Sequence, residues 1–111
     1  MKITTHVLDT SRGRPADGVP VVLDKESKGG WTRVGAATTD ANGRAGDLLG
    51  SAALEAGAWR LVFDTAAYFR ARGIDGFYPD VTISFVVRDP AEHHHVPLLL
   101  SPHGFSTYRG S

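Results

Sequence analysis

The residues best suited to chemistry are histidines in the first and last segments of the chain. His6 lies in a stretch of alternating polarity, and His93, His94 and His95 stand in a row near the end. In a strand, His93 and His95 would share one face and His94 would point to the other. A neutral imidazole accepts a proton near pH 7, so two of them suit hydrolysis by an activated water. Strand histidines are more often hydrogen-bonded structural residues, and spacing alone does not show that these side chains converge.

Arg44 follows the strongest turn signal in the sequence. Residues 40–43 read Asp-Ala-Asn-Gly, and Asn-Gly suits the positive φ angles of a type I′ hairpin turn. A residue next to a tight turn is held by it, so we expect Arg44 to have a fixed role. Beside the histidines, its charge would keep them neutral and would bind an anionic substrate or a developing oxyanion.

The sequence finishes on an aromatic residue, a cation, a glycine and a serine, where most chains carry dispensable polar residues. We therefore expect the terminus to take part in the site. Tyr108 is predicted in a pocket wall, with a packed structural aromatic as the alternative. Ser111 is predicted to offer its hydroxyl or the terminal carboxylate as a hydrogen-bond partner. A Ser-His nucleophile is disfavoured, because no strand-turn-helix elbow or orienting acid is recognisable.

A metal site is the competing interpretation of the histidine row. His93 and His95 would present two ring nitrogens to zinc, but His94 or His103 would have to fold around to add a third. Carboxylates are not clustered nearby, so we expect neither a metal ion nor another cofactor. The chain has no cysteine, which excludes disulfides, thiol nucleophiles and Cys-ligated metal.

Length and charge limit the classes of partner. The 111 residues are enough for one hydrophobic core, so we expect a single domain, 1–111. Twelve basic and twelve acidic side chains cancel, and no basic block argues for nucleic acid or a membrane surface as partner. An apolar leader and a stretch of membrane-spanning length are both missing from the sequence. The expected location is the cytoplasm.

Short strands, frequent turn residues and one short helix predict an all-β sandwich. The helix is expected from a cap at Asp64 or Thr65 through Arg70, with Gly73 ending it. The expected strands are 3–10, 19–23, 31–39, 58–64, 81–88, 93–100 and 105–108, with 47–49 as a further short candidate. The expected connections are a loop at 11–18, a hairpin tip at 25–30, a turn at 101–104 and an unassigned segment at 50–57.

The apolar run 96–100 does not alternate with polar residues, so both of its faces need cover. The domain core would cover one face, and a partner subunit is the simplest cover for the other. Pro97 lies inside this run and has no backbone donor. We expect it at a sheet edge, a bulge or the start of a strand.

Three segments together resemble the transthyretin-like family, and in particular its enzyme branch, which hydrolyses 5-hydroxyisourate. They are ITTHVLDTSRGRPADGVPVVL, FYPDVTISFVVRD and HHHVPLLLSPHGFSTYRGS, and the resemblance runs over nearly the whole chain. The final YRGS is the most specific part, because the hormone-carrying transthyretins have lost it together with the catalytic histidines. The resemblance implies a transthyretin-like sandwich of two four-stranded sheets with one short helix, assembled as a homotetramer with sites at the dimer-dimer interface.

The resemblance also implies a reaction and its residues. The substrate would be 5-hydroxyisourate, opened by water to 2-oxo-4-hydroxy-4-carboxy-5-ureidoimidazoline in urate degradation. His6 and His95 would hold and deprotonate the water, and Arg44 would orient the substrate and stabilise charge. Tyr108 would form part of the pocket wall, and Ser111 would join the polar network. The resemblance does not say which histidine is the base.

The chain departs from the family pattern at a few positions. His94 stands where the family more often has an aromatic residue such as tyrosine, and His103 and Phe105 replace more usual residues near the turn. Two other functions stay open: a non-enzymatic carrier of a small aromatic ligand, and a zinc-dependent hydrolase. A carrier needs no proton acceptor, so the histidines favour the enzyme.

Overall fold

The computed structural model describes residues 2–111, and Met1, the first residue of the expected domain, lies outside them. Within the described residues the chain forms eight strands and one helix. In order they are β1 (Ile3–Asp9), β2 (Arg14–Pro15), β3 (Pro20–Ser27), β4 (Gly30–Thr38), β5 (Gly57–Phe63), α1 (Thr65–Ala71), β6 (Val81–Val87), β7 (His94–Ser101) and β8 (Gly104–Thr107). No helix among residues 2–111 is both long enough and apolar enough to cross a membrane.

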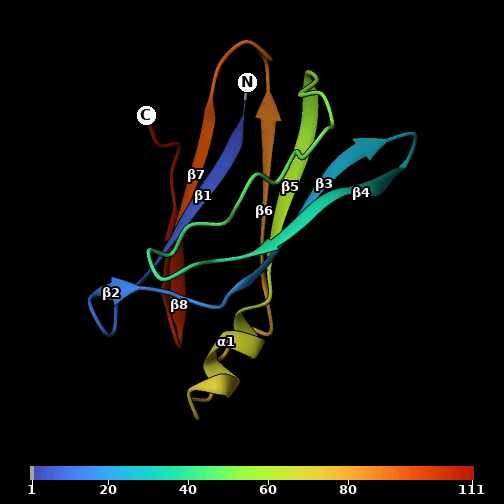
Figure 1. Cartoon of the computed structure of the whole chain (residues 1–111). Helices are drawn as coiled ribbons and strands as arrows, with labels where there is room; N and C mark the ends of the chain where they lie inside the picture. The colour runs from blue at the N-terminus through green and yellow to red at the C-terminus, as the bar shows by residue number, and fades with distance from the viewer. Residues whose placement is uncertain (1) are drawn as a thin grey trace.

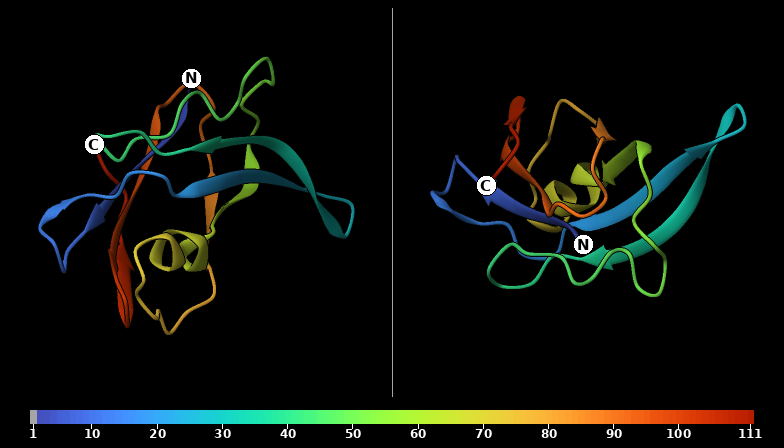
Figure 2. Two further views of the ribbon diagram at one scale, coloured as in Figure 1. Left: turned by 60° about the horizontal axis from the view of Figure 1, so that its bottom comes forward. Right: turned by 90° about the horizontal axis from the view of Figure 1, so that it is seen from above.

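The strands form two four-stranded sheets that share one core (Figure 1). The strand order is β2-β1-β7-β8 in one sheet and β4-β3-β5-β6 in the other. α1 lies at one end of the strands in Figure 1, and in the view from above in Figure 2 it lies behind them. The expected all-β sandwich of two four-stranded sheets with one short helix is confirmed.

β1 and β7 lie side by side as the central, parallel pair of the first sheet. Their register pairs Thr4 with His95 and His6 with Pro97. Along β1 every second residue is buried, beginning with Ile3, so the predicted alternation is correct. One face of the pair therefore enters the core, and the opposite face holds Thr4, His6 and His95 toward solvent.

The core is built from the inner faces of both sheets and from α1. Each fully buried large apolar side chain stabilises the fold by about 1.5 to 3 kcal/mol relative to exposure. The largest fully buried side chains are Trp59, Tyr68, Phe63, Phe69, Ile3, Leu23, Leu48, Leu61 and Leu98.

A buried carboxylate joins the end of β1 to α1. Asp9 is completely buried and accepts hydrogen bonds from the hydroxyls of Tyr68 (2.7 Å) and Ser11 (2.6 Å). The backbone N–H groups of Ser11 and Arg12 also donate to it. Burial raises the pKa of Asp9, but these hydrogen bonds favour the ionised form and the net pKa is lowered. The pKa of Tyr68 is raised by burial and by its bond to this carboxylate.

The helix follows its sequence signals. The Asp64 carboxylate accepts a hydrogen bond from the backbone N–H of Ala67 at 3.0 Å, which is the geometry of an N-cap. Gly73 adopts φ 69°, as expected for the residue after a helix end. The predicted cap and stop are both confirmed.

The turn before Arg44 differs from the predicted type I′ hairpin. The backbone N–H of Gly43 donates to the carbonyl of Asp40, and Gly43 has φ 77° while Asn42 does not have a positive φ. A type I′ turn would need positive φ at both of these residues. The Asn-Gly pair signals a turn, but the turn type depends on the strands beside it, and here Arg44 makes only an isolated bridge to β1.

Pro97 lies inside an interior strand, so its expected place at an edge, a bulge or a strand start is wrong. The Pro97 carbonyl accepts a hydrogen bond from the Thr107 hydroxyl at 2.7 Å, so the carbonyl and the backbone nitrogen of Pro97 face β8. The β7-β8 ladder runs only from Ser101 to Leu98, the pair partner of Thr107. The missing donor of Pro97 therefore falls just beyond the ladder, where no strand requires it.

Two expected connections and one expected short strand also differ from the structure. The predicted loop 11–18 contains the two-residue strand β2. The predicted hairpin tip 25–30 is mostly strand, because β3 continues to Ser27 and the reversal is confined to Lys28 and Gly29. Residues 47–49 form no strand, although Leu48 and Leu49 are buried and add to the core.

Candidate active site

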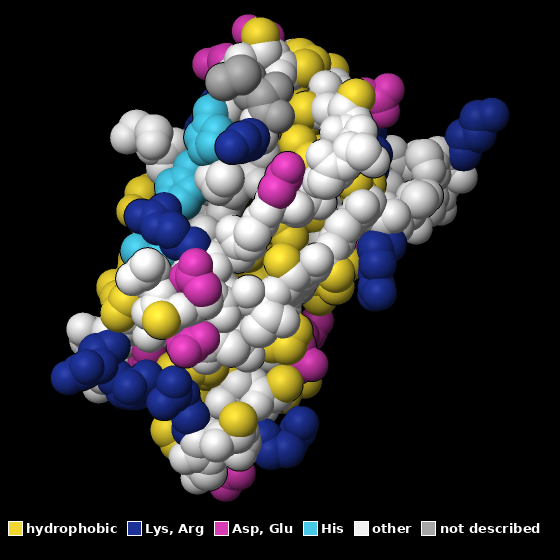
Figure 3. All heavy atoms as spheres, in the orientation of Figure 1, with side chains coloured by type: hydrophobic (Ala, Val, Ile, Leu, Met, Phe, Trp, Pro, Cys, Tyr) yellow, Lys and Arg dark blue, Asp and Glu magenta, His cyan; other side chains and the backbone are white. Residues whose placement is uncertain are grey.

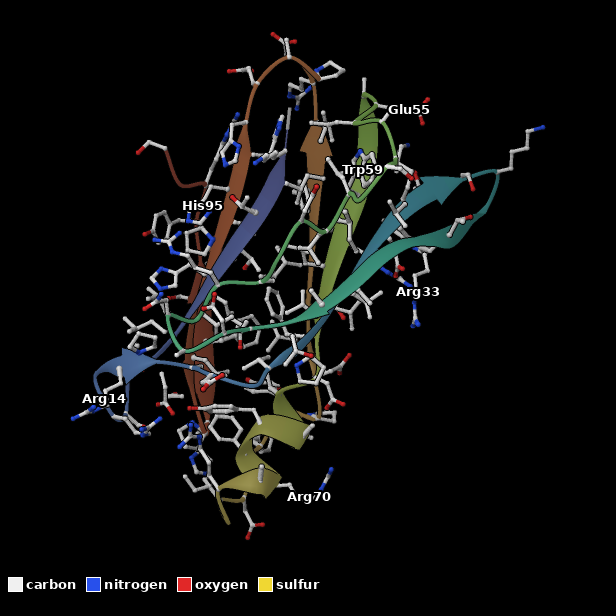
Figure 4. All side chains as sticks on the ribbon, viewed as in Figure 1. Arg14, Arg33, Glu55, Trp59, Arg70 and His95 are labelled. Atoms are coloured by element: carbon white, nitrogen blue, oxygen red, sulfur yellow. The ribbon has the colours of Figure 1, made fainter. Side chains whose placement is uncertain are left out.

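His95 is held at the centre of the polar face by contacts on two sides. Its Nδ1 lies 2.8 Å from the hydroxyl of Thr4, its pair partner on β1. Its backbone carbonyl accepts a hydrogen bond from Gly110 at 2.8 Å, which fixes the C-terminal segment against β7. A Cβ added to Gly110 would lie 2.5 Å from Cδ2 of the His95 ring, so only glycine allows this close approach. Figure 4 shows His95 on the side of the sheet that carries this segment.

The environment of His95 keeps its imidazole neutral. Burial contributes most to lowering the pKa of His95 from the ordinary 6.5. Electrostatic repulsion from Arg44 lowers it further, and so do the electrostatic interactions with His6 and His93. A hydrogen bond with the backbone of Thr4 raises the pKa of His95, but by less than the other effects lower it. His95 is therefore ready to accept a proton at neutral pH.

Arg44 and His6 are brought together by the turn at 40–43. Arg44 forms an antiparallel bridge with His6, and the carbonyl of the neighbouring Gly43 accepts a hydrogen bond from Val7 at 2.8 Å. A Cβ on Gly43 would clash with the Val7 carbonyl and would lie 3.2 Å from Cδ2 of His6. The positive φ of Gly43 and the lack of a Cβ thus place Arg44 next to the histidines, as the sequence suggested.

A polar cavity of about 360 Å³ opens beside these residues. Arg44, His95 and Ser111 line it together with Thr4, Thr5, Ala45 and His93. Figure 3 shows the histidine side chains gathered along one margin of the molecule, with basic side chains beside them. Arg44 makes no ion pair with any described residue, so its charge is available to the cavity.

Tyr108 lies on a different cavity, of about 250 Å³, which has a mainly apolar lining. The lining comes from β6 and from both sides of the β7-β8 hairpin, and it includes Phe85, Val86 and His95. Tyr108 is 58% exposed, so within this one chain its ring is not packed as a structural aromatic. His95 borders both cavities.

The structure thus brings four of the five predicted site residues close together. His6 and Arg44 are bridged across strands, and Arg44, His95 and Ser111 share one cavity, although His6 is not among the residues that line it. Tyr108 lines the apolar cavity instead, and His95 is the residue that the two cavities share.

Sequence reasoning missed Thr4 and gave His93 no role apart from metal binding. The Thr4 hydroxyl lies 2.9 Å from Nε2 of His93 as well as 2.8 Å from Nδ1 of His95. Thr4 alternates onto the same face as His6, and that signal was available. The pairing of Thr4 with His95 could not be read from the sequence, because the parallel register of β1 and β7 has no local sequence marker.

The other histidines stay out of this group. His94 is buried on the opposite face, and its Nδ1 is 3.0 Å from the carbonyl of Glu92. His103 is exposed in the turn between β7 and β8, at the other end of β7 from His95. Within residues 2–111, no three His, Cys, Asp or Glu side chains are grouped to hold a metal ion.

The arrangement suits addition of water to a polarised carbonyl. A neutral imidazole can take the proton of the water, and a guanidinium can stabilise the negative charge that develops on the carbonyl oxygen. Backbone pairing fixes the main-chain positions from which His95 and Arg44 extend, so the main chain needs little reorganisation when a substrate binds.

Comparison with known proteins gives one consistent family. The profile of the HIUase/Transthyretin family matches residues 3–110. A relative named 5-hydroxyisourate hydrolase from Salmonella dublin is 42% identical over 109 residues, which cover 98% of this chain and 80% of that protein.

Solved structures agree with this result. The 5-hydroxyisourate hydrolase of Klebsiella pneumoniae has a TM-score of 0.85 and 38% identity, covering 98% of this chain and 92% of that one. Sea bream transthyretin in complex with thyroxine has a TM-score of 0.92 and 30% identity, covering 99% of this chain and 95% of that one.

Proposed function

Because the chain belongs to the HIUase/Transthyretin family, we propose that it hydrolyses 5-hydroxyisourate in urate degradation. Relatives that bear this activity in their names are about two fifths identical to the chain over nearly its full length. The observation that carries the proposal is the joint placement of His95, Arg44 and Ser111 on one polar cavity, with His6 bridged to Arg44.

In the proposed reaction, His95 or His6 removes a proton from a water molecule, and the water oxygen bonds to a ring carbonyl carbon of the substrate. Arg44 orients the substrate and stabilises the resulting oxyanion. The oxyanion then reforms a carbonyl as the carbon–nitrogen bond breaks, and the protonated imidazole returns its proton to the departing nitrogen. The carbonyl becomes a carboxylate and the nitrogen becomes part of a ureido group, giving 2-oxo-4-hydroxy-4-carboxy-5-ureidoimidazoline.

Two further residues complete the proposed site. Ser111 lines the polar cavity beside Arg44 and supplies hydrogen bonds to the substrate or the water. Tyr108 forms a pocket wall once a second chain covers its exposed ring. No cofactor is needed for this chemistry, because the imidazole and guanidinium groups supply the proton transfer and the charge stabilisation.

The proposed assembly is a homotetramer with sites at the dimer-dimer interface. β6 and β8 are edge strands, and they present the exposed apolar side chains Val86 and Phe105. Exposed apolar edge strands commonly pair with another chain. Light scattering on the purified protein should give a mass four times the 11.9 kDa of the chain. A monomer mass at the working concentration would contradict this assembly.

The test of the activity is the ultraviolet absorbance decay of 5-hydroxyisourate, generated freshly by urate oxidase. We expect the protein to accelerate the decay, with and without excess chelator. Acceleration that the chelator abolishes would favour a zinc-dependent hydrolase.

A non-enzymatic carrier is the second candidate, because the fold also matches a transthyretin in complex with thyroxine. Decay at the spontaneous rate would support it. Binding of a small aromatic ligand, measured by calorimetry, would then be the decisive observation.

A further inference from the structure

The Thr4 hydroxyl lies between two imidazoles on the polar face. Its Oγ1 is 2.9 Å from Nε2 of His93 and 2.8 Å from Nδ1 of His95, within hydrogen-bonding distance of both. The two rings lie nearly parallel, with centroids 6.5 Å apart and an interplanar angle of 23°. The pairing of Thr4 with His95 in the β1-β7 ladder places the two residues side by side.

A hydroxyl has one proton, so Thr4 can donate to only one of these two nitrogens. If it donates to His93, then His95 must donate from Nδ1, and a neutral His95 keeps a free lone pair on Nε2. If it donates to His95, then His93 must donate from Nε2, and a neutral His95 carries its proton on Nε2. The tautomers of the two histidines are therefore coupled through one hydroxyl.

We propose that Thr4 and His93 are positioning residues that hold His95 in the tautomer with Nδ1 protonated and Nε2 free to accept a proton. This inference rests on the proposed hydrolase function, since only a reaction with a general base requires that tautomer.

The surroundings of His95 support this arrangement. No described residue forms a hydrogen bond with its Nε2, while Nδ1 is occupied by Thr4. His95 borders the polar cavity with Arg44 and Ser111, which leaves Nε2 as its free nitrogen for a bound water. After Nε2 takes the proton, Nδ1–H continues to donate to Thr4, so the imidazolium is stabilised without movement of the ring.

His93 supplies the other half of the arrangement. It is exposed, and its Nε2 gives the Thr4 proton an acceptor that directs this proton away from His95. Without that acceptor, the hydroxyl is free to turn and donate to Nδ1 of His95, which selects the inactive tautomer.

The first test is nitrogen-detected NMR of the imidazoles above neutral pH, which separates protonated from unprotonated ring nitrogens. We expect Nδ1 of His95 to be protonated and Nε2 to be unprotonated. In Thr4→Val this preference should weaken, because Nδ1–H loses the hydroxyl as an acceptor and keeps only backbone groups of residue 4, and Thr4→Ser should restore it. A wild-type His95 protonated at Nε2, or the same tautomer in Thr4→Val, would overturn the inference.

The second test is turnover of 5-hydroxyisourate. Thr4→Val should lower kcat by about 10- to 100-fold with a small change in KM, whereas Thr4→Ser should stay within about twofold of the wild type. His93→Ala should lower kcat by about fivefold, the scale of one lost hydrogen bond. Thr10→Val is the matched control for Thr4, because it removes a hydroxyl that donates to the Leu100 carbonyl of β7 from the residue directly after β1. His103→Ala is the exposed-histidine control.

The two tests separate failure of the inference from failure of the function. A wild-type protein without hydrolase activity would remove the proposed function, and the NMR test would still report on the tautomer. An active wild type with an equally active Thr4→Val and unchanged imidazole signals would keep the function and remove the roles of Thr4 and His93.

Discussion

Two polar networks are attached to β1, and they differ in how completely the protein satisfies them. At the end of the strand, the Asp9 carboxylate receives hydrogen bonds from two hydroxyls and two backbone N–H groups and is sealed from solvent. On the opposite face, near the start of the strand, His95 has one ring nitrogen within hydrogen-bonding distance of Thr4, and the residue lines an open polar cavity.

The difference shows what each network can do. A buried carboxylate whose acceptors are used has nothing left to offer a substrate, and its hydrogen bonds hold α1 to the sheet. An imidazole with one unbonded ring nitrogen, beside a guanidinium without an ion pair, lowers the stability of the protein little, because the cavity is open to water. It keeps a lone pair and a charge for another molecule. Changes to the first network should therefore alter stability, and changes to the second should alter turnover.

The largest expected effect is on turnover. His95→Ala should lower the hydrolysis rate of 5-hydroxyisourate at least about 100-fold, because it removes a proton acceptor at the cavity. Arg44→Ala should do the same through loss of charge stabilisation. Steady-state kinetics measures the rate, and urea unfolding should show nearly unchanged stability. Wild-type turnover by either variant would contradict the site assignment.

Next comes a stability effect at the other network. Asp9→Ala should lower the free energy of unfolding by about 2 to 3 kcal/mol, because it leaves buried donors without their acceptor. Urea unfolding followed by circular dichroism measures this change. The folded variant should keep kcat close to the wild-type value, and a loss of kcat larger than about tenfold would mean that the two networks are coupled.

A smaller effect tests the packing of the C-terminal segment against the imidazole. Gly110→Ala should lower kcat by about tenfold, because the added Cβ displaces the His95 ring or the segment itself. Gly30→Ala is the matched control, since a Cβ there meets nothing within 4 Å. Equal kinetics for the two variants would show that the contact with Gly110 does not position His95.

The smallest expected effects are on the stability of the protein at acidic pH. The pKa of His95 is lowered from 6.5 in the folded state, so the unfolded chain binds this proton more readily and stability falls as the pH drops below 6.5. The pKa of Asp9 is lowered from 3.8, so its contribution is present above 3.8 and is lost as the pH falls through the folded value.

Unfolding curves over a pH series should separate these two windows. His95→Gln should flatten the dependence just below pH 6.5, and Asp9→Asn should flatten it below 3.8. Parallel curves for wild type and His95→Gln across the first window would contradict the lowered pKa of His95.

Much of the fold was predictable because local rules determined it. The alternation along β1, the Asp64 cap and the Gly73 stop depend on neighbouring residues only, and each appears where the sequence indicated. Pro97 was misplaced because its tolerance depends on where β8 stops pairing, which is a property of two strands.

The residue types of the candidate site were predictable from the sequence, but only part of its geometry was. Arg44 was singled out because a turn precedes it, although the turn has a different type from the expected one. Thr4 was not singled out, because its contact with His95 comes from a parallel register with a strand more than 80 residues away. Tyr108 was assigned to the same pocket as Arg44, and within one chain it lines the apolar cavity, which shares His95 with the polar cavity.

The parallel pairing of β1 and β7 also has a consequence for biosynthesis. Contacts across so much sequence close late, because the entropy of a long loop must be lost before they form. The second sheet, whose strands lie between positions 20 and 87, can assemble from the emerging chain before β7 is made. The polar cavity needs Thr4 from one end of the chain and His95 and Ser111 from the other, so a ribosome that stops early releases a chain with most of a core and an incomplete cavity.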